Sequence, residues 1–247
     1  MRHGEEFLYS GNELDAMATA SNYYRWITDQ FAPFLGPRVI EVGAGIGTVA
    51  SLLLERPAVR RLIAIEPAAN TFPILADRFR GDSRVEVIQG VLGEVPVPEA
   101  VNTVIAVNVL EHVRDDEGFV RAAQEAVMPD GHLLLFVPAM PAIYGALDDS
   151  FGHFRRYTKE SLGSILRACG WDVVRLSYAN LPGVVAWLMA SKVLRKRTIG
   201  RASVRVYDRL VFPLVSRLEA KWEPFIGQSL LAVARNPRSP VSQSLRS

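Results

Sequence analysis

A glycine-rich turn directly after a short apolar segment limits the folds open to this chain more than any other feature. The segment Val39–Val42 is predicted to be a buried strand, and Gly43, Gly45 and Gly47 follow it before the apolar run Val49–Leu54. Glycine has no Cβ, so its backbone can approach a ligand closely, and the first turn of a helix offers unpaired N–H groups. The pattern therefore predicts a strand–turn–helix unit that cradles the polar part of a nucleotide-like ligand.

The spacing of these glycines differs from the dinucleotide-binding fingerprint. That fingerprint is Gly-x-Gly-x-x-Gly, whereas the third glycine here comes one residue early and Thr48 takes the position that needs glycine. Glu41, two residues before the first glycine, is also foreign to the fingerprint. A second predicted strand, Arg61–Glu66, ends in an acid 19 residues after Gly47. This is about the distance at which doubly wound folds place a carboxylate on ribose hydroxyls.

Three segments carry a resemblance to a known family. Glu-x-Gly-x-Gly-x-Gly at 41–47 resembles motif I of the class I S-adenosylmethionine (SAM)-dependent methyltransferases. Asn108–Val113 resembles the Asn-x-Leu-Glu-His-Val/Ile signature of a small-molecule subgroup, and Gly152–Thr158 resembles a Gly-His-x-Arg-Arg-Tyr-Thr/Ser segment of the same subgroup. The resemblance covers residues 15–235. It implies an enzyme that uses SAM and releases S-adenosylhomocysteine.

The resemblance and the apolar patterning together imply an α/β fold, with a doubly wound, seven-stranded, mostly parallel sheet. Nearly continuous apolar strands are typical of parallel sheets that are covered on both faces. The resemblance implies that the last two strands form a hairpin, with the seventh antiparallel and beside the fifth. The predicted strands are Val39–Val42, Arg61–Glu66, Val85–Gln89, Val101–Val107, His132–Val137, Trp171–Ser177 and Ser229–Ala234.

The chain is predicted to be one methyltransferase domain over residues 1–235. The first part of this domain, residues 1–14, is expected to be a polar lead-in or a lid. A cap helix is expected at 15–36, before the first strand, and a helical insertion or lid at 180–227, between the last two strands. Residues 236–247 are rich in Pro, Ser and Arg and are predicted to be a flexible tail.

Composition narrows the cellular setting. A net charge of +2 gives no general case for nucleic acid as a partner. The one cysteine, Cys169, excludes an intrachain disulfide and a cysteine-rich zinc site, which favours a reducing, cytoplasmic location. No apolar run reaches the roughly 18 residues that a membrane span requires. The first residues lack the apolar core of a signal peptide.

The resemblance implies a SAM site at the carboxyl ends of the strands, with Glu66 on the ribose hydroxyls. The family often carries an Asp after the third strand, where it bonds the adenine amino group. Here that segment is Gln89–Leu92, so backbone groups or Gln89 must serve the adenine edge. The expected cofactor-binding residues are Glu41, Gly43, Ala44, Gly45, Gly47, Glu66, Pro67, Gln89, Val91, Leu92, Asn108, Val109 and His112.

Methyl transfer from SAM depends largely on alignment and exclusion of water, but a hydroxyl acceptor also needs a general base. Histidine titrates near neutral pH. His153 is the favoured base because it lies in the segment after the fifth strand, and His112 is the second candidate. His132 is set aside, because it opens a strand at the opposite edge. The expected substrate contacts are Tyr23, Trp26, Tyr144, Arg155, Arg156 and Tyr157.

A metal-assisted mechanism needs clustered acids around the exits of the fourth and fifth strands. Acids are present there, but they form no tight ligand motif, so no metal site is predicted. These acids are Asp115, Asp116, Asp148 and Asp149.

The segment 184–210 joins an apolar helical stretch, Val184–Leu194, to the basic run Arg195–Arg197. Apolar residues beside basic ones suit a peripheral membrane contact. They suit a dimer surface, a substrate lid or a solvated basic face as well. The protein is accordingly expected to be a monomer or a homodimer.

Three functions remain open on the sequence alone. The favoured one is methyl transfer from SAM to a small molecule, such as a natural product, a sugar or a lipid-like acceptor, with O-methylation preferred. The second is an NAD(P)-dependent dehydrogenase of the same architecture, against which the glycine spacing and the lack of a Tyr-x-x-x-Lys pair count. The third is a SAM-binding protein without methyl transfer, which only the departure at Gln89–Leu92 supports.

Overall fold

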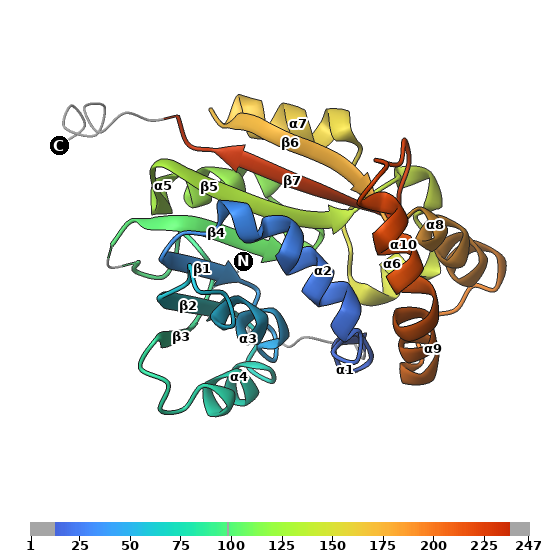
Figure 1. Ribbon diagram of the computed structural model, residues 1–247, viewed down its shortest axis with the longest axis horizontal. Helices are drawn as coiled ribbons and strands as arrows, with labels where there is room; N and C mark the ends of the chain where they lie inside the picture. Colours follow the sequence, from blue (N-terminus) through green and yellow to red (C-terminus); the bar gives the residue numbers. More distant parts are fainter. Residues whose placement is uncertain (1–12, 98, 238–247) are drawn as a thin grey trace.

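The computed structural model describes residues 13–97 and 99–237, so residues 1–12 of the predicted lead-in and 238–247 of the predicted tail lie outside it. The described chain forms a seven-stranded sheet in the order β3-β2-β1-β4-β5-β7-β6 (Figure 1). Its strands are β1 (Arg38–Val42), β2 (Arg61–Glu66), β3 (Val85–Gln89), β4 (Val101–Val107), β5 (Val127–Pro138), β6 (Asp172–Ala179) and β7 (Ser229–Arg235).

The strand directions confirm the predicted topology. Strands β1 to β5 pair in parallel, and β7 runs antiparallel between β5 and β6. The strand order reverses between β1 and β4: β2 and β3 follow β1 toward one edge of the sheet, and β5, β7 and β6 follow β4 toward the other. Ligands in open α/β sheets bind outside the carboxyl ends of the strands at such a switch point.

Helices cover both faces of the sheet because alternate strand residues point to opposite sides. In β2, Leu62 packs with the core beneath α2 (Ser21–Phe31) and α3 (Thr48–Leu54). Its neighbour Ile63 packs with the core beneath α5 (Asp116–Ala126) and α7 (Lys159–Ala168). Helix α4 (Phe72–Arg78) joins the α3 side through Leu75. Both faces are thus apolar and buried.

The segment predicted as a cap helix at 15–36 is helical, but it is divided into separate elements. Helix α1 (Glu13–Met17) ends before α2 begins, and the short 3₁₀ turn η1 (Ala32–Phe34) follows α2. At the break, the hydroxyl of Thr19 donates to the carbonyl of Ala16 at 2.7 Å. Such local side-chain bonds compete with the helical ladder. The break lets α2 lie on the sheet while α1 packs against α9 (Arg201–Val206) (Figure 1).

Two boundaries near β5 also differ from the prediction. The strand begins at Val127, and Asp130 within it has a positive φ of 60°. Asn236, the first residue of the predicted flexible tail, is buried. Its side-chain amide donates to the Val127 carbonyl at 2.8 Å, and its N–H donates to the Gly131 carbonyl at 2.8 Å. The ordered chain therefore extends beyond β7 by at least this residue.

The predicted helical insertion between β6 and β7 is present. It starts where β6 ends and leads into Ser229, which pairs with Pro138 at the carboxyl end of β5. The insertion therefore lies at the same edge as the glycine turn (Figure 1). No helix in the described ranges is long and apolar enough to cross a membrane. The insertion consists of α8 (Leu181–Trp187), the π-helix η4 (Leu188–Val193), α9, the π-helix η5 (Tyr207–Val211) and α10 (Phe212–Glu219).

Candidate active site

The glycine turn adopts a backbone that side chains disfavour. Gly43, Gly45 and Gly47 have φ angles of 67°, 56° and 83°, and α3 begins at the next residue. A Cβ on Gly43 would lie 2.5 Å from a methyl carbon of Val109, so only glycine fits there. Val109 follows β4, and this contact therefore joins the glycine turn to the Asn108–Val113 segment.

Glu66 is bound to the glycine turn by its own carboxylate. Oε2 accepts the N–H of Gly45 at 2.7 Å, and Oε1 accepts the Ala68 N–H and the Thr71 hydroxyl, each at 2.9 Å. A carboxylate offers about four acceptor positions, so these three bonds leave about one for a ligand. Glu66 therefore lies beside the glycine turn with capacity for one further donor, and its ribose contact stays a prediction.

Glu41 lies on β1 beneath the turn and is 3% exposed. Its Oε2 atom is buried and accepts no hydrogen bond from the described residues. Burial raises the pKa of Glu41 well above its usual range, and the charge of Glu66 adds to this. A cationic ligand near the turn would favour the ionised form of this carboxylate.

The residues expected at the adenine end lie at the carboxyl ends of β2 and β3. Gln89 pairs with Glu66 in the sheet register and is exposed. Leu92 is buried, and Val91 and Pro67 are partly exposed. An exposed amide beside apolar side chains can receive a planar heterocycle, and the adenine contacts of these residues stay a prediction.

Asn108 ends β4 in a left-handed conformation, with φ 54°. Its N–H donates to the Phe136 carbonyl at 2.8 Å, which fixes the exit of β4 against β5. The chain then turns into η2 (Leu110–His112). The segment Asn108–Val113 therefore runs from Val109, beside the glycine turn, to His112.

His153 and His112 come together, as the two predicted base candidates must if they share one site. Their rings meet edge to face, with centroids 4.8 Å apart. Nδ1 of His153 lies 2.9 Å from Oδ1 of Asp148, and the side chain is 8% exposed. The carboxylate accepts a hydrogen bond from Nδ1–H, so Nε2 carries the lone pair that can accept a proton from a substrate.

Asp148 lies on α6 (Ala146–Phe151) and is completely buried. Burial alone would raise its pKa, but the hydrogen bonds from His153 and Arg156 hold the pKa of Asp148 below its ordinary value. Nε of Arg156 lies 2.7 Å from Oδ1, and Nε1 of Trp187 lies 3.1 Å from Oδ2. Asp148 is therefore an ionised anchor for the histidine.

His112 and Glu111 complete the cluster. Burial lowers the pKa of His112 to about 4 and raises the pKa of Glu111 to about 7. A pKa of about 4 makes the ring of His112 a weak proton acceptor, so His112 is a weaker candidate for the base. Glu111, His112 and His153 each offer one ligand atom within 4.8 Å of the others. The cluster could therefore also hold a divalent cation, unlike the acids considered from sequence.

Three of the predicted substrate contacts have partners within the protein. Tyr157 is 2% exposed, and its hydroxyl donates toward Asp116 at 3.1 Å. Arg155 pairs with the same carboxylate at 2.6 Å. Arg156 has no exposed side-chain surface and stacks over the ring of Trp187. Arg156 and Tyr157 are thus buried with partners inside the protein, whereas the Arg155 side chain is 33% exposed. Substrate binding by these three residues stays a prediction.

The aromatic residues of α2 also pack into the fold. Tyr23 is 8% exposed and meets Phe136 and Phe212 edge to face. Trp26 contacts the same two rings and is partly exposed. Tyr23 is thus a packing residue that joins α2 to β5 and α10. Trp26 keeps some surface for a substrate.

Tyr144 holds the loop that carries the histidine. Its hydroxyl lies 2.8 Å from the His153 carbonyl and 3.0 Å from Oδ1 of Asp149. Burial and the bond to Asp149 raise the pKa of Tyr144 to about 12, so the phenol stays protonated. Its bond to the His153 carbonyl fixes the backbone of that loop, and a substrate contact by Tyr144 stays a prediction.

The sequence analysis considered Asp148 only as a possible metal ligand, and it assigned neither Glu111 nor Trp187 to the site. Asp148 stands five residues before His153, and an acid close to a histidine could have drawn attention to the pair. No sequence signal connects Trp187 to this cluster, because it lies 39 residues after Asp148.

The site fits SAM, which carries a cationic sulfonium and an amino group. Glu41 offers a buried carboxylate oxygen, Oε2, without a hydrogen-bond partner among the described residues, and the turn offers backbone that a Cβ would block. Together with the strand order, these features define the class I SAM-dependent methyltransferases.

Comparison with known proteins agrees with this class. Residues 18–176 match the family model described as a methyltransferase domain, and the chain belongs to that family. A probable SAM-dependent methyltransferase of Mycolicibacterium smegmatis is 28% identical over 141 residues, 56% of this chain and 53% of that protein. A ubiquinone biosynthesis O-methyltransferase of Methylocella silvestris is 34% identical over 110 residues, 42% of this chain and 41% of that one. The chain thus spans about half the length of these curated relatives, or less.

A solved structure shares the fold. Phosphoethanolamine N-methyltransferase 2 of Haemonchus contortus, in complex with SAM, aligns with a TM-score of 0.59 and 18% identity. The alignment covers 88% of this chain and 53% of that one. Family membership separates this chain from the dehydrogenase alternative, because the two share only the doubly wound architecture.

Proposed function

We propose that this protein transfers a methyl group from SAM to a hydroxyl of a small-molecule acceptor, with His153 as the general base. The observation that carries the proposal is the His153–Asp148 pair at the carboxyl edge of the sheet. Contacts lead from it to the cofactor turn, since His112 touches His153 and Val109 of the same segment touches Gly43. A base and a cofactor cradle therefore occupy one side of the molecule.

The cofactor residues have distinct tasks in this proposal. The glycine turn brings backbone N–H groups to the cofactor, and Glu41 faces its positive charge. Glu66 accepts one ribose hydroxyl while it holds Gly45, and Gln89 meets the adenine edge. SAM supplies the activated methyl group when bound. Alignment of an acceptor against that group can supply a large part of the rate.

His153 handles the proton of the acceptor. Its Nε2 atom accepts the hydroxyl proton as the oxygen becomes nucleophilic, while Nδ1 keeps its proton toward Asp148. The imidazolium that forms is stabilised by the ionised Asp148 carboxylate, which Arg156 and Trp187 hold in place. General base catalysis of this kind contributes about 10²–10⁴-fold.

The proposal favours oxygen over nitrogen as the methylated atom, because a neutral amine already carries a nucleophilic lone pair and needs no general base. A panel of phenols, sugars and long-chain alcohols, incubated with SAM, tests it by mass spectrometry of the products. The expected result is S-adenosylhomocysteine together with a methyl ether of at least one acceptor. Methylation confined to amines or carbon acids, or to nucleic acid in a parallel incubation, would contradict the proposed acceptor.

A further inference from the structure

Exposed apolar side chains are concentrated in the insertion. Of fifteen large hydrophobic side chains that are exposed within the described residues, twelve lie between Val185 and Phe225. A few single exposed residues are normal on a protein surface, whereas a concentration of this size marks an interaction site. The most exposed of the twelve are Val185 at 65%, Leu210 at 68%, Leu218 at 67% and Phe225 at 73%.

Part of this surface is an ordered stripe. Val206, Leu210, Leu214, Leu218 and Trp222 follow one another at intervals of four along α9, η5, α10 and the turn after it, and each is more than half exposed. Residues four apart are neighbours on a helix surface. The helices α9, η5 and α10 form one helical rod, and the inner side of this rod is also apolar, since Val204, Phe212 and Val215 are buried in the fold. A helix that is apolar on two faces needs a second apolar environment.

A second helical rod, α8 with η4, connects this surface to the candidate active site. On its inner side, Trp187 donates to Asp148, and Ser191 accepts the N–H of Leu147 at 3.2 Å. On its outer side, Val185 and Met189 are 65% and 46% exposed. The rod that helps to hold the carboxylate of the base therefore presents an apolar face to the outside.

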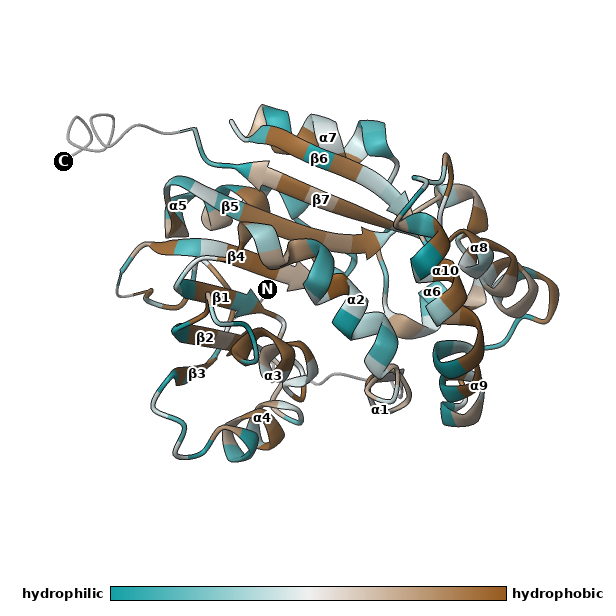
Figure 2. Ribbon diagram, in the orientation of Figure 1, coloured by the Kyte–Doolittle hydropathy of each residue, from teal (hydrophilic) through white to brown (hydrophobic). Residues whose placement is uncertain are grey.

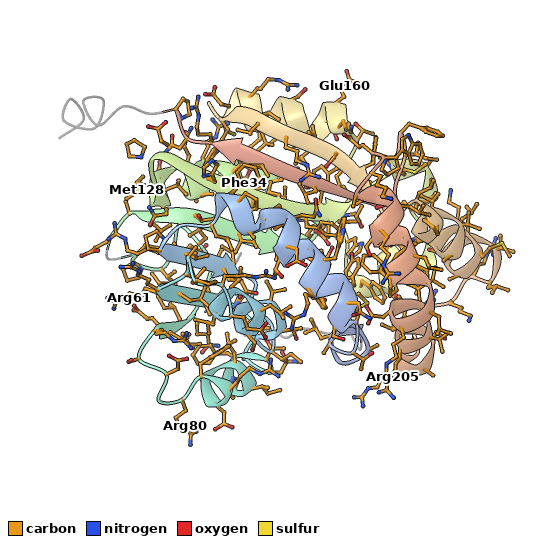
Figure 3. All side chains as sticks on the ribbon, in the orientation of Figure 1. Phe34, Arg61, Arg80, Met128, Glu160 and Arg205 are labelled. Carbon is orange, nitrogen blue, oxygen red and sulfur yellow. The ribbon has the colours of Figure 1, made fainter. Side chains whose placement is uncertain are left out.

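The same insertion is strongly basic. Residues 181–227 contain nine Lys or Arg and three acids, in a chain whose net charge is only +2. The acids are engaged elsewhere: Asp208 accepts the N–H groups of Asn22 and Tyr23, Glu219 those of Asn180 and Leu181, and Glu223 pairs with Lys159. The basic side chains therefore dominate the outer charge. Figure 3 shows Arg205 projecting outward from α9.

We propose that the docking surface formed by α8, η4, α9, η5 and α10 binds the surface of an anionic lipid bilayer. Apolar side chains beside basic ones match the acyl boundary and the acidic headgroups of such a bilayer. Trp222 and Phe225 add the aromatic residues that favour the interface. Figure 2 shows apolar and polar residues side by side on α9 and α10. If the proposed function holds, the acceptor is a hydroxylated lipid, taken up beside the rod that contacts Asp148.

A second copy of this chain is a poorer occupant of the docking surface. A twofold interface brings the same patch of each protomer together. Here it would bring two strongly basic surfaces into contact, and like charges repel. An anionic bilayer offers the opposite charge and an apolar layer at once. Charge complementarity thus selects the membrane.

Sedimentation with extruded vesicles tests the docking surface without any need for the acceptor. The full chain should sediment with vesicles of phosphatidylcholine and phosphatidylglycerol at low salt, much less at high salt, and weakly with phosphatidylcholine alone. The double variant Leu210→Glu/Leu214→Glu should lose the binding. The control Ile74→Glu, at an exposed residue of α4 outside the docking surface, should retain it. The triple variant Arg195→Ala/Lys196→Ala/Arg197→Ala should weaken partitioning by about fivefold per charge.

Two results would overturn the proposal. One is a folded protein that stays in the supernatant with anionic vesicles at low salt. The other is vesicle binding that Leu210→Glu/Leu214→Glu leaves intact. Light scattering adds a further arm: a dimer that the double variant dissociates, without vesicle binding, would assign the surface to a second copy. SAM affinity by calorimetry, measured on every variant, reports the cofactor site separately, so a failed docking surface and a failed methyltransferase assignment are distinguishable.

Discussion

Nδ1 of His153 lies 2.9 Å from Oδ1 of Asp148, and that carboxylate is completely buried. The pair sets the tautomer of the histidine, because an ionised carboxylate accepts a proton and donates none. Nε2 is thereby left to accept a proton from a substrate. This relationship distinguishes His153 from His112, whose burial lowers its pKa to about 4.

Replacement of the anchor tests this relationship. Asp148→Asn offers His153 an amide in place of the carboxylate, so the preferred tautomer is lost. We expect turnover to fall by about 10² or more, while SAM affinity stays unchanged. Steady-state kinetics and calorimetry measure the two quantities. The matched control is Asp149→Asn, since Asp149 accepts a hydrogen bond from Tyr144, whereas Asp148 is the carboxylate that lies at Nδ1 of His153.

Thermal unfolding must accompany this comparison, because removal of one member of a buried ion pair typically costs about 3–5 kcal/mol. A folded Asp148→Asn enzyme with the turnover of the Asp149→Asn control would show that His153 needs no anchor.

Glu66 is expected to contribute directly to cofactor affinity. Glu66→Gln keeps the size of the side chain but removes its charge, so SAM binding should weaken by roughly 1.5–3 kcal/mol, the range for hydrogen bonds to a charged group. Calorimetry measures the change. Glu86→Gln, on the neighbouring strand β3, serves as the control. Equal affinities in the two folded variants would remove Glu66 from the cofactor site.

Glu41 is expected to couple SAM binding to pH. Burial raises its pKa in the folded, ligand-free protein, so the folded state keeps a proton that the unfolded state has lost. Stability should therefore fall as pH rises above the unfolded pKa of Glu, and Glu41→Gln should remove that fall. Cationic SAM favours the ionised carboxylate, so its affinity should rise with pH.

Calorimetry in buffers of different ionisation enthalpy measures the proton release that accompanies SAM binding. Release that persists unchanged in Glu41→Gln would assign the titration to another group.

Metal removal is expected to leave turnover unchanged. Although Glu111, His112 and His153 could hold a cation, the guanidinium of Arg156 interacts electrostatically with Glu111 and opposes a further positive charge there. Dialysis against EDTA followed by assay is the test. A loss of activity that Mg²⁺, Mn²⁺ or Zn²⁺ restores would show that this cluster is a metal centre.

The fold was largely predictable because its signals are local. Apolar strands, the glycine turn and the acid that ends β2 each lie within a few consecutive residues. The division of the cap helix was not predicted, because its break depends on the separate packing of α1 against α9 and of α2 on the sheet. Such contacts connect residues that are far apart along the chain.

The site was predictable in part for the same reason. His153 and His112 could be selected by residue type and position, and the structure brings them together. The contacts of Arg155 and Tyr157 with Asp116 were not predictable, because Asp116 lies on α5, about 40 residues earlier in the chain. A basic or aromatic side chain in a promising segment binds whichever partner the tertiary fold places nearest.

The central claim is that His153 acts as the base of a SAM-dependent methyl transfer. The most direct test is the rate of S-adenosylhomocysteine formation in a single turnover, at saturating SAM and with an acceptor identified by the panel. We predict that His153→Ala lowers this rate by about 10²–10⁴-fold while SAM affinity matches that of the unmodified chain and the variant remains folded. A stable His153→Ala enzyme that forms product at the unmodified rate would contradict the account.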